Sequence, residues 1–120
     1  DAVLVVMSFE PAFRRRMMTS FPSKMMNAMQ LGLPVVIWGP EYCSAVQWAR
    51  LGNRALCVTK ADASALRDAL ETLADSPSEQ QRLAKSAREA AAGDFNSDRI
   101  QEKFIAVLTE AISRARGRMI

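Results

Sequence analysis

The chain has 120 residues, of which 49% are apolar and 24% charged, and its net charge is +3. These values fit one globular domain spanning residues 1–120 and are a weak signal for nucleic acid, so no nucleic-acid partner is expected. Histidine is absent, and Cys43 and Cys57 form no C-x-x-C pair, so the sequence predicts no metal site and two buried free thiols, as is usual in a cytoplasmic protein.

The first half of the chain alternates between apolar runs and helical patterns. In chain order we expect a strand at 2–9, a loop at 10–21, a helix at 22–31, a strand at 33–39, a helix at 40–52 and a strand at 55–59. The apolar runs are rich in Val, which is typical of strands buried on both faces. Gly32 and Gly52 stand where the two helices should stop.

The second half is predicted to be helical. Asp62 is a good N-cap for a helix, and a polar surface helix is expected at 78–92 after the breaker "DSPSEQ". A last helix is expected from Ser97, and residues 113–120 are a basic tail that should fray. The apolar face of this last helix comprises Ile100, Phe104, Val107, Leu108 and Ala111.

The order of the elements predicts an α/β fold. Strands that alternate with helices imply right-handed crossovers and a Rossmann-like parallel sheet with helices on both faces. The chain begins directly on strand residues and has only three strands. We therefore interpret it as part of a longer domain whose upstream strands are missing, and a sheet edge cut in this way gives reason to expect self-association.

A candidate site lies where the second helix begins, in "SFPSK". Ligands of open parallel sheets bind beyond the carboxyl ends of the strands, and here three loops qualify: 8–21, 39–43 and 59–62. Pro22 has no N–H, but Ser23 and Lys24 offer backbone amides at the positive end of the helix, and the Lys24 ammonium could reach a phosphate oxygen. Alternatively, Ser20 caps an ordinary helix and Lys24 is simply solvated.

Other residues near these loops have two interpretations each. Arg14, Arg15 and Arg16 form either a phosphate clamp or a solvated basic run. Glu41 either binds ligand hydroxyls or is a first-turn carboxylate favoured by the helix dipole. Helical spacing predicts core positions for three methionines, and core positions are also expected for the two tryptophans: Met25, Met26, Met29, Trp38 and Trp48.

Three segments together resemble a known family. They are "DAVLVVMS", "SFPSKMMNAMQLGLPVVIWGP" and "LGNRALCVTKADASALRDALETLADSPSEQQRLAKSAREAAAGDF". They resemble the C-terminal, nucleotide-sugar-binding domain of GT-B-fold glycosyltransferases, of the family 4 type (glycosyl transferases group 1) found in bacterial polysaccharide biosynthesis. The match covers almost the whole chain, and its most specific part is "FPSK" followed by "AMQLGLPVV".

The resemblance implies half of a site for a nucleotide-diphosphate sugar. In such enzymes the start of this helix meets the diphosphate, which maps onto Ser23 and Lys24, with Ser20, Phe21 and Pro22 beside them. Many relatives carry two glutamates, for the donor sugar and the ribose. The matching residues here are Thr19 and Asn27, and Asn27 could still hydrogen-bond a ribose hydroxyl.

The resemblance also implies a glycosyltransferase that needs no metal or cofactor. The acceptor, a sugar or lipid-linked hydroxyl, would bind an N-terminal domain that lies outside this chain, and the chain alone should not turn over. A cytoplasmic protein is expected, with attachment to the inner membrane face as an alternative. Two further functions stay open: a degenerate domain that binds partners without catalysis, and another enzyme of GT-B shape such as a sugar-nucleotide epimerase.

Overall fold

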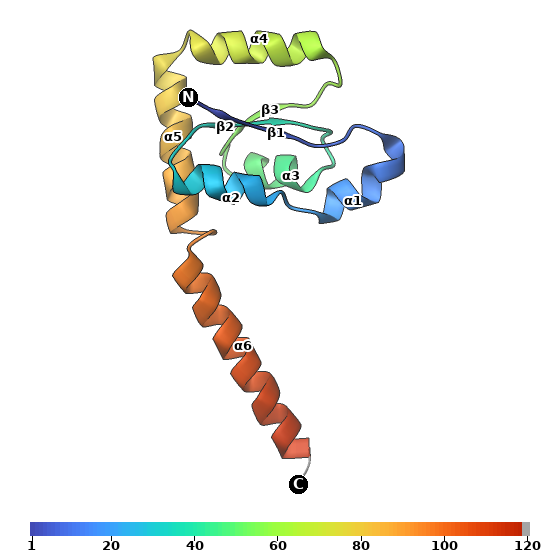
Figure 1. Ribbon diagram of the computed structural model, residues 1–120, viewed down its shortest axis with the longest axis vertical. Coiled ribbons are helices and arrows are strands. Elements are labelled where there is room, and N and C mark those ends of the chain that lie inside the picture. Colours follow the sequence, from blue (N-terminus) through green and yellow to red (C-terminus); the bar gives the residue numbers. More distant parts are fainter. Residues whose placement is uncertain (119–120) are drawn as a thin grey trace.

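Three parallel strands form the centre of the molecule in the computed structural model, which describes residues 1–118. The strands are β1 (Val3–Val6), β2 (Val35–Trp38) and β3 (Leu56–Val58), in the spatial order β1-β2-β3. Val36 lies opposite Leu4 on one side and Leu56 on the other. The predicted α/β class is confirmed as a small parallel sheet flanked by helices, an arrangement compatible with a Rossmann-like fold (Figure 1).

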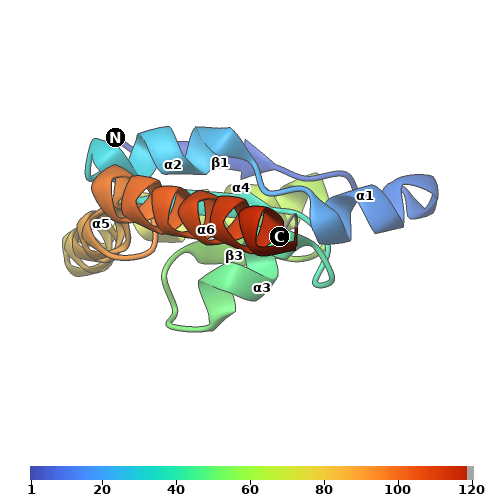
Figure 2. The same ribbon diagram turned by 90° about the horizontal axis from the view of Figure 1, so that it is seen from below.

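Helices cover both faces of the sheet and lie at both of its ends. They are α1 (Arg14–Thr19), α2 (Ser23–Gln30), α3 (Ser44–Arg50), α4 (Ala63–Ala74), α5 (Pro77–Ala92) and α6 (Ser97–Arg118), with a short 3-10 turn, η1 (Pro11–Phe13), before α1. α2 and α3 lie on one face and α4 on the other. α5 crosses the end where β1 begins, and α1 lies at the opposite end (Figures 1 and 2).

The apolar core divides along the two faces of the sheet. Because alternate side chains of a strand point to opposite faces, Val35 and Ile37 pack with α2 and α3, while Val36 packs with Leu73 of α4 and Leu83 of α5. Met25 and Met29 of α2 are fully buried, as predicted, whereas Met26 is only half-buried. Both predicted core tryptophans are half-buried as well.

The loop expected at 10–21 is wrong in its main part, because this segment folds into η1 and α1. Arg and Met have high helix propensity, and five of them in a row outweigh the turn signal of Pro11, which stands at the first position of η1. The helix expected at 40–52 also starts later, at Ser44. Glu41 therefore precedes α3 and is not a first-turn carboxylate.

Gly32 ends α2 as predicted. Its φ of +67° lies in the left-handed region, where residues with a Cβ are strained, and its amide donates to the carbonyl of Met29. The chain can then turn sharply from α2 into β2.

α6 leaves the body of the molecule. The radius of gyration is 18.0 Å, against about 14 Å for a compact domain of this length. Figure 1 shows α6 continuing beyond α5, away from the sheet. The prediction that the chain frays from residue 113 is wrong for residues 113–118, which continue α6 as a regular helix. Residues 119–120 lie outside the described part of the chain. Among residues 1–118, no helix has the length and hydropathy that spanning a bilayer requires.

Candidate functional site

The start of α2 lies at the carboxyl end of the parallel sheet. α2 connects β1 to β2, and α1 precedes it at the end of the sheet where the strands finish (Figures 1 and 2). Among residues 1–118, no acceptor takes the amides of Ser23 and Lys24, the first two residues of α2, whereas the amide of Met25 donates to Pro22. Two free N–H groups at a helix start provide partial positive charge for an anion.

The prediction that Ser20 caps α2 is wrong. The N-cap is Pro22, with φ −72° and ψ 122°, and no side chain caps the helix. Ser20 instead ends α1: its backbone is extended and its amide donates to the carbonyl of Arg16. No side chain in "SFPSK" therefore caps α2, and the first amides of α2 are free to bind solvent or a ligand.

Aromatic packing fixes the position of Phe21, just before α2. Its ring lies 5.9 Å from Trp48 of α3, edge-on, and 5.5 Å from Phe95, which precedes α6. Trp48 also donates from Nε1 to the Asp94 carboxylate, and the Arg54 guanidinium lies 4.8 Å from the Trp48 ring. This cluster explains why Phe stands before Pro22, and sequence reasoning missed it because its members are far apart in the chain.

Contacts with α3 and the turn before it hold the other side of the loop. The Ser44 hydroxyl donates to the carbonyl of Ser20, and the Arg14 guanidinium lies 4.5 Å from the centre of the Tyr42 ring. Arg14 is thus partly engaged by an aromatic ring. Arg15 and Arg16 are exposed, and among the described residues neither forms an ion pair. Both guanidinium groups therefore lie on α1, which ends at Thr19 before the chain enters α2 at Ser23, and that of Arg16 lies 5.6 Å from the centre of the Phe13 ring.

The predicted site residues differ in their exposure. Ser23, Lys24 and Asn27 of α2 are exposed, whereas Phe21 and Pro22 are half-buried. Asn27 follows Ser23 by one helical turn, so the two share a face of α2. Lys24 forms no ion pair within the described residues. Its ammonium is free to reach an anion at the helix start.

The Thr19 side chain hydrogen-bonds within its own helix, α1. Its hydroxyl donates to the carbonyl of Arg15 at 3.0 Å. The oxygen can still accept a hydrogen bond, because a hydroxyl has lone pairs to spare.

The other two loops at this end are held mainly by interactions within the protein. Trp38 donates from Nε1 to the carbonyl of Lys60 at 2.8 Å, and its ring packs edge-on against Phe9 at 5.9 Å. Glu41 lies 3.6 Å from Arg50 as an exposed ion pair. Asp62 caps α4, as predicted, by accepting from the amide of Ser64. The positive charges at this end that form no ion pair among the described residues therefore include Lys60 as well as Arg15, Arg16 and Lys24 of α1 and α2.

The cysteines do not contribute a reactive group. Both thiols are free; Cys43 is buried, as predicted, and Cys57 is half-buried. Burial raises the pKa of the Cys43 thiol and of the Cys57 thiol, so both are protonated at neutral pH. In the part of the chain that the structure describes, no cluster of Cys, Asp and Glu is suited to hold a metal ion.

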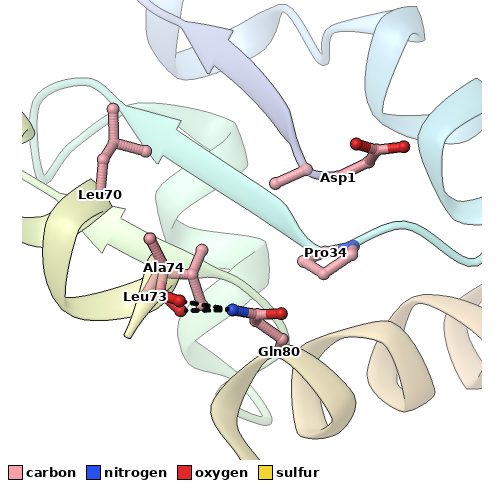
Figure 3. A pocket seen from close by; sticks show the side chains of 7 residues that line it. Asp1, Pro34, Leu70, Leu73, Ala74 and Gln80 are labelled. Atoms are coloured by element: carbon pink, nitrogen blue, oxygen red, sulfur yellow. Dashed lines mark hydrogen bonds between the residues drawn. The ribbon is translucent and has the colours of Figure 1, made fainter. Parts of the chain in front are cut away.

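A cavity of about 300 Å³ lies at the other end of the sheet, where the strands begin (Figure 3). Apolar side chains such as Leu70 and Leu73 line most of it. Its one amide, from Gln80, donates to the carbonyls of Leu73 and Ala74 at 2.8 and 3.1 Å, so it caps α4 rather than facing a ligand. No predicted site residue lines this cavity, and its chemistry does not suit an anion.

Comparison of the chain with protein-family models, curated proteins and solved structures finds no match.

Proposed function

We propose that this chain is the donor-binding part of a glycosyltransferase of GT-B type, and that the start of α2 binds the diphosphate of a nucleotide-diphosphate sugar. The observation that carries the proposal is the pair of free amides on Ser23 and Lys24, at the carboxyl end of a parallel sheet, with an unpaired ammonium beside them. The resemblance of "FPSK" and "AMQLGLPVV" to that family supports the same assignment.

The chemistry of the proposed site is electrostatic. The two amides and the Lys24 ammonium would stabilise the negative charge that grows on the diphosphate as the sugar leaves. Arg15 and Arg16 add positive potential near the same end of the sheet. Asn27 offers an amide to a ribose hydroxyl from the next turn of α2. The acceptor and the rest of the catalytic groups would belong to a part of the protein that precedes this chain.

Chemical-shift mapping of the 120-residue chain tests where the ligand binds. Uridine diphosphate and guanosine diphosphate should each shift the amide signals of Ser23 and Lys24 most strongly. Uridine without phosphates is the matched control and should shift them far less. Shifts confined to residues away from 19–27, or no shift at millimolar ligand, would contradict the proposal.

A second candidate is a domain that binds an anionic partner without catalysis. The observations that favour it are the exposed Arg15 and Arg16, and the absence of a carboxylate at Thr19 and Asn27. An assay of donor hydrolysis and sugar transfer, made with the protein that contains this chain, distinguishes the two candidate functions. Turnover that Lys24→Ala abolishes would exclude the non-catalytic candidate. Anion binding without turnover would favour it.

A further inference from the structure

Asp94 lies in the turn between α5 and α6, and its side chain bonds to a distant part of the chain (Figure 1). One carboxylate oxygen, Oδ2, accepts from Nε1 of Trp48 at 3.2 Å and from the Arg54 guanidinium at 2.9 Å. Trp48 lies in α3 and Arg54 in the segment that follows it, 46 and 40 residues away in the sequence. The carboxylate therefore joins the turn before α6 to the end of α3.

The helix ends beside Asp94 use other groups. The amide of Gly93, which ends α5, donates to the carbonyl of Glu89. At the start of α6, the carboxamide oxygen of Asn96 accepts from the amide of Arg99 at 3.1 Å. The carboxylate of Asp94 is therefore available for the contacts with α3.

The ion pair with Arg54 does not by itself explain this carboxylate. The two side chains are 29% and 55% exposed, and ion pairs between exposed groups contribute little to stability. The hydrogen bond from Trp48 has a further consequence, because this indole is part of the aromatic cluster beside α2.

The hydrogen bond to the carboxylate fixes the direction of the Trp48 ring. An indole has a single N–H donor, so a bond from this donor selects one orientation of the ring. The Arg54 guanidinium lies 4.8 Å from the ring centre, and Phe95 packs against the ring at 5.2 Å. Phe21 then contacts the same ring edge-on at 5.9 Å. The position of Phe21 therefore depends on an indole whose direction Asp94 sets.

Phe21 passes this constraint to the start of α2. Only Pro22 separates Phe21 from Ser23, and because proline fixes its own φ, the chain has little freedom between the ring and the first amides of the helix. The turn before α6 also reaches the other end of α2, since the Gln30 carboxamide donates to the carbonyl of Phe95 at 3.2 Å. Contacts from this one turn thus hold both ends of α2.

We infer that Asp94 is a positioning residue for the diphosphate site at the start of α2, acting through Trp48 and Phe21. This inference rests on the proposed function, because it concerns the same site. Two amides bind one phosphate well only when both point at it, and a pair held in place before binding loses less freedom on binding. Loosening the start of α2 should therefore weaken nucleotide binding, although Asp94 itself does not contact the nucleotide.

The charge of Asp94 separates the positioning effect from an electrostatic one. Removal of a carboxylate raises the positive potential of the chain, which by charge alone favours an anionic ligand. A loss of affinity in Asp94→Ala therefore has the opposite sign to the charge effect. Asp98, exposed in the first turn of α6, provides the matched control, since Asp98→Ala makes the same change of charge.

Calorimetry with uridine diphosphate measures the effect on binding. Asp94→Ala should weaken binding about fivefold, because the Trp48 ring loses the hydrogen bond that orients it. Asp94→Asn keeps a carbonyl oxygen for Trp48, so its affinity should stay within about twofold of that of the native chain. Asp98→Ala should bind at least as tightly as the native chain. Circular dichroism checks that each variant is folded.

A second substitution tests the path through Trp48. Trp48→Phe keeps an aromatic ring but removes the N–H donor, so it should weaken binding as Asp94→Ala does. The double variant should lose little more than either single variant, because both changes remove the same hydrogen bond. Losses that simply add in the double variant would contradict this path.

Amide chemical shifts of the ligand-free chain test the positioning without a nucleotide. Asp94→Ala should move the signals of Ser23 and Lys24, although both residues are far from it in the sequence. Asp94→Asn and Asp98→Ala should move these signals much less. A general loss of stability would not produce this pattern.

The outcomes separate this inference from the proposed function. If the native chain binds uridine diphosphate and Asp94→Ala changes neither the affinity nor the signals of Ser23 and Lys24, the positioning role is wrong and the proposed function stands. Equal weakening in Asp94→Ala and Asp98→Ala would also overturn the positioning role. A native chain that binds no uridine diphosphate would overturn the proposed function, and with it the role of Asp94 at that site.

Discussion

Phe21 shows how a single residue sets the geometry of the proposed site. Its ring packs against both Trp48 and Phe95, which also contact each other, and the half-buried Pro22 that follows is the N-cap of α2. The fixed φ of proline and the anchored ring together set the direction in which α2 begins. Lys24 is therefore an exposed residue at a helix start whose backbone is fixed by the packing of Phe21 and Pro22.

Asp62 allows a pH-dependent prediction at the residue scale. Its carboxylate accepts from the amide and the hydroxyl of Ser64, and these hydrogen bonds hold its pKa below the ordinary value. Because the folded pKa is lower than that of the unfolded chain, this stabilisation is complete above about pH 4 and is lost as the pH falls through the folded pKa. Asp62→Asn keeps a capping side chain but removes this dependence.

Urea unfolding at about pH 6 and about pH 2.5 measures the effect. The native chain should lose more stability between these pH values than Asp62→Asn does. Asp68→Asn, a matched change on the exposed side of α4, should keep the full acid dependence. Equal acid dependence in the native chain and in Asp62→Asn would contradict the role of the cap.

At the scale of the elements, patterns within one segment could be read from the sequence and contacts between segments could not. The Val-rich runs predicted β1 and β2, the spacing of Leu66 and Leu73 predicted α4, and Asp62 was identified as its cap. These features depend on neighbours a few residues apart. α1 was missed because its helix propensity was weighed against Pro11 and the charge of its arginines.

The proposed site shows the same division. The sequence predicted Ser23 and Lys24 as site residues, because the first amides of a helix that follows a parallel strand bind anions readily. It misassigned Ser20, whose amide bonds to α1 and whose carbonyl accepts from Ser44 of α3, a contact across distant parts of the chain. The aromatic cluster around Phe21 likewise joins residues of three separate segments.

Gly32 provides a prediction for the end of α2. A residue with a Cβ would be strained at the φ of +67° found here, and its Cβ would lie 3.0 Å from Cγ of Arg88. Gly32→Ala should therefore lower the free energy of unfolding by about 1–2 kcal/mol. In Gly117→Ala the new Cβ meets no atom within 4 Å and the residue lies in a helix, so this control should be neutral or stabilising. Chemical denaturation of both variants checks the difference, and equal stability would contradict it.

At the scale of the whole molecule, the proposed diphosphate site and the exposed helix α6 approach each other at Asn27. The amides of Ser23 and Lys24 lie at the start of α2, whereas Met26, Asn27 and Gln30 of α2 line a hollow together with Ile100 and Phe104 of α6. A nucleotide that reaches Asn27 would therefore lie next to the base of α6.

The affinity of the chain for uridine diphosphate, measured by calorimetry in the native chain and in two lysine variants, tests the central claim most directly. Lys24→Ala should weaken binding about tenfold, because a charge-assisted hydrogen bond to the diphosphate contributes roughly 1.5 kcal/mol or more. Lys85→Ala removes the same charge from α5, at the other end of the sheet, and should change the affinity less than about twofold. Equal losses in the two variants, or no loss in Lys24→Ala, would contradict a diphosphate site at the start of α2.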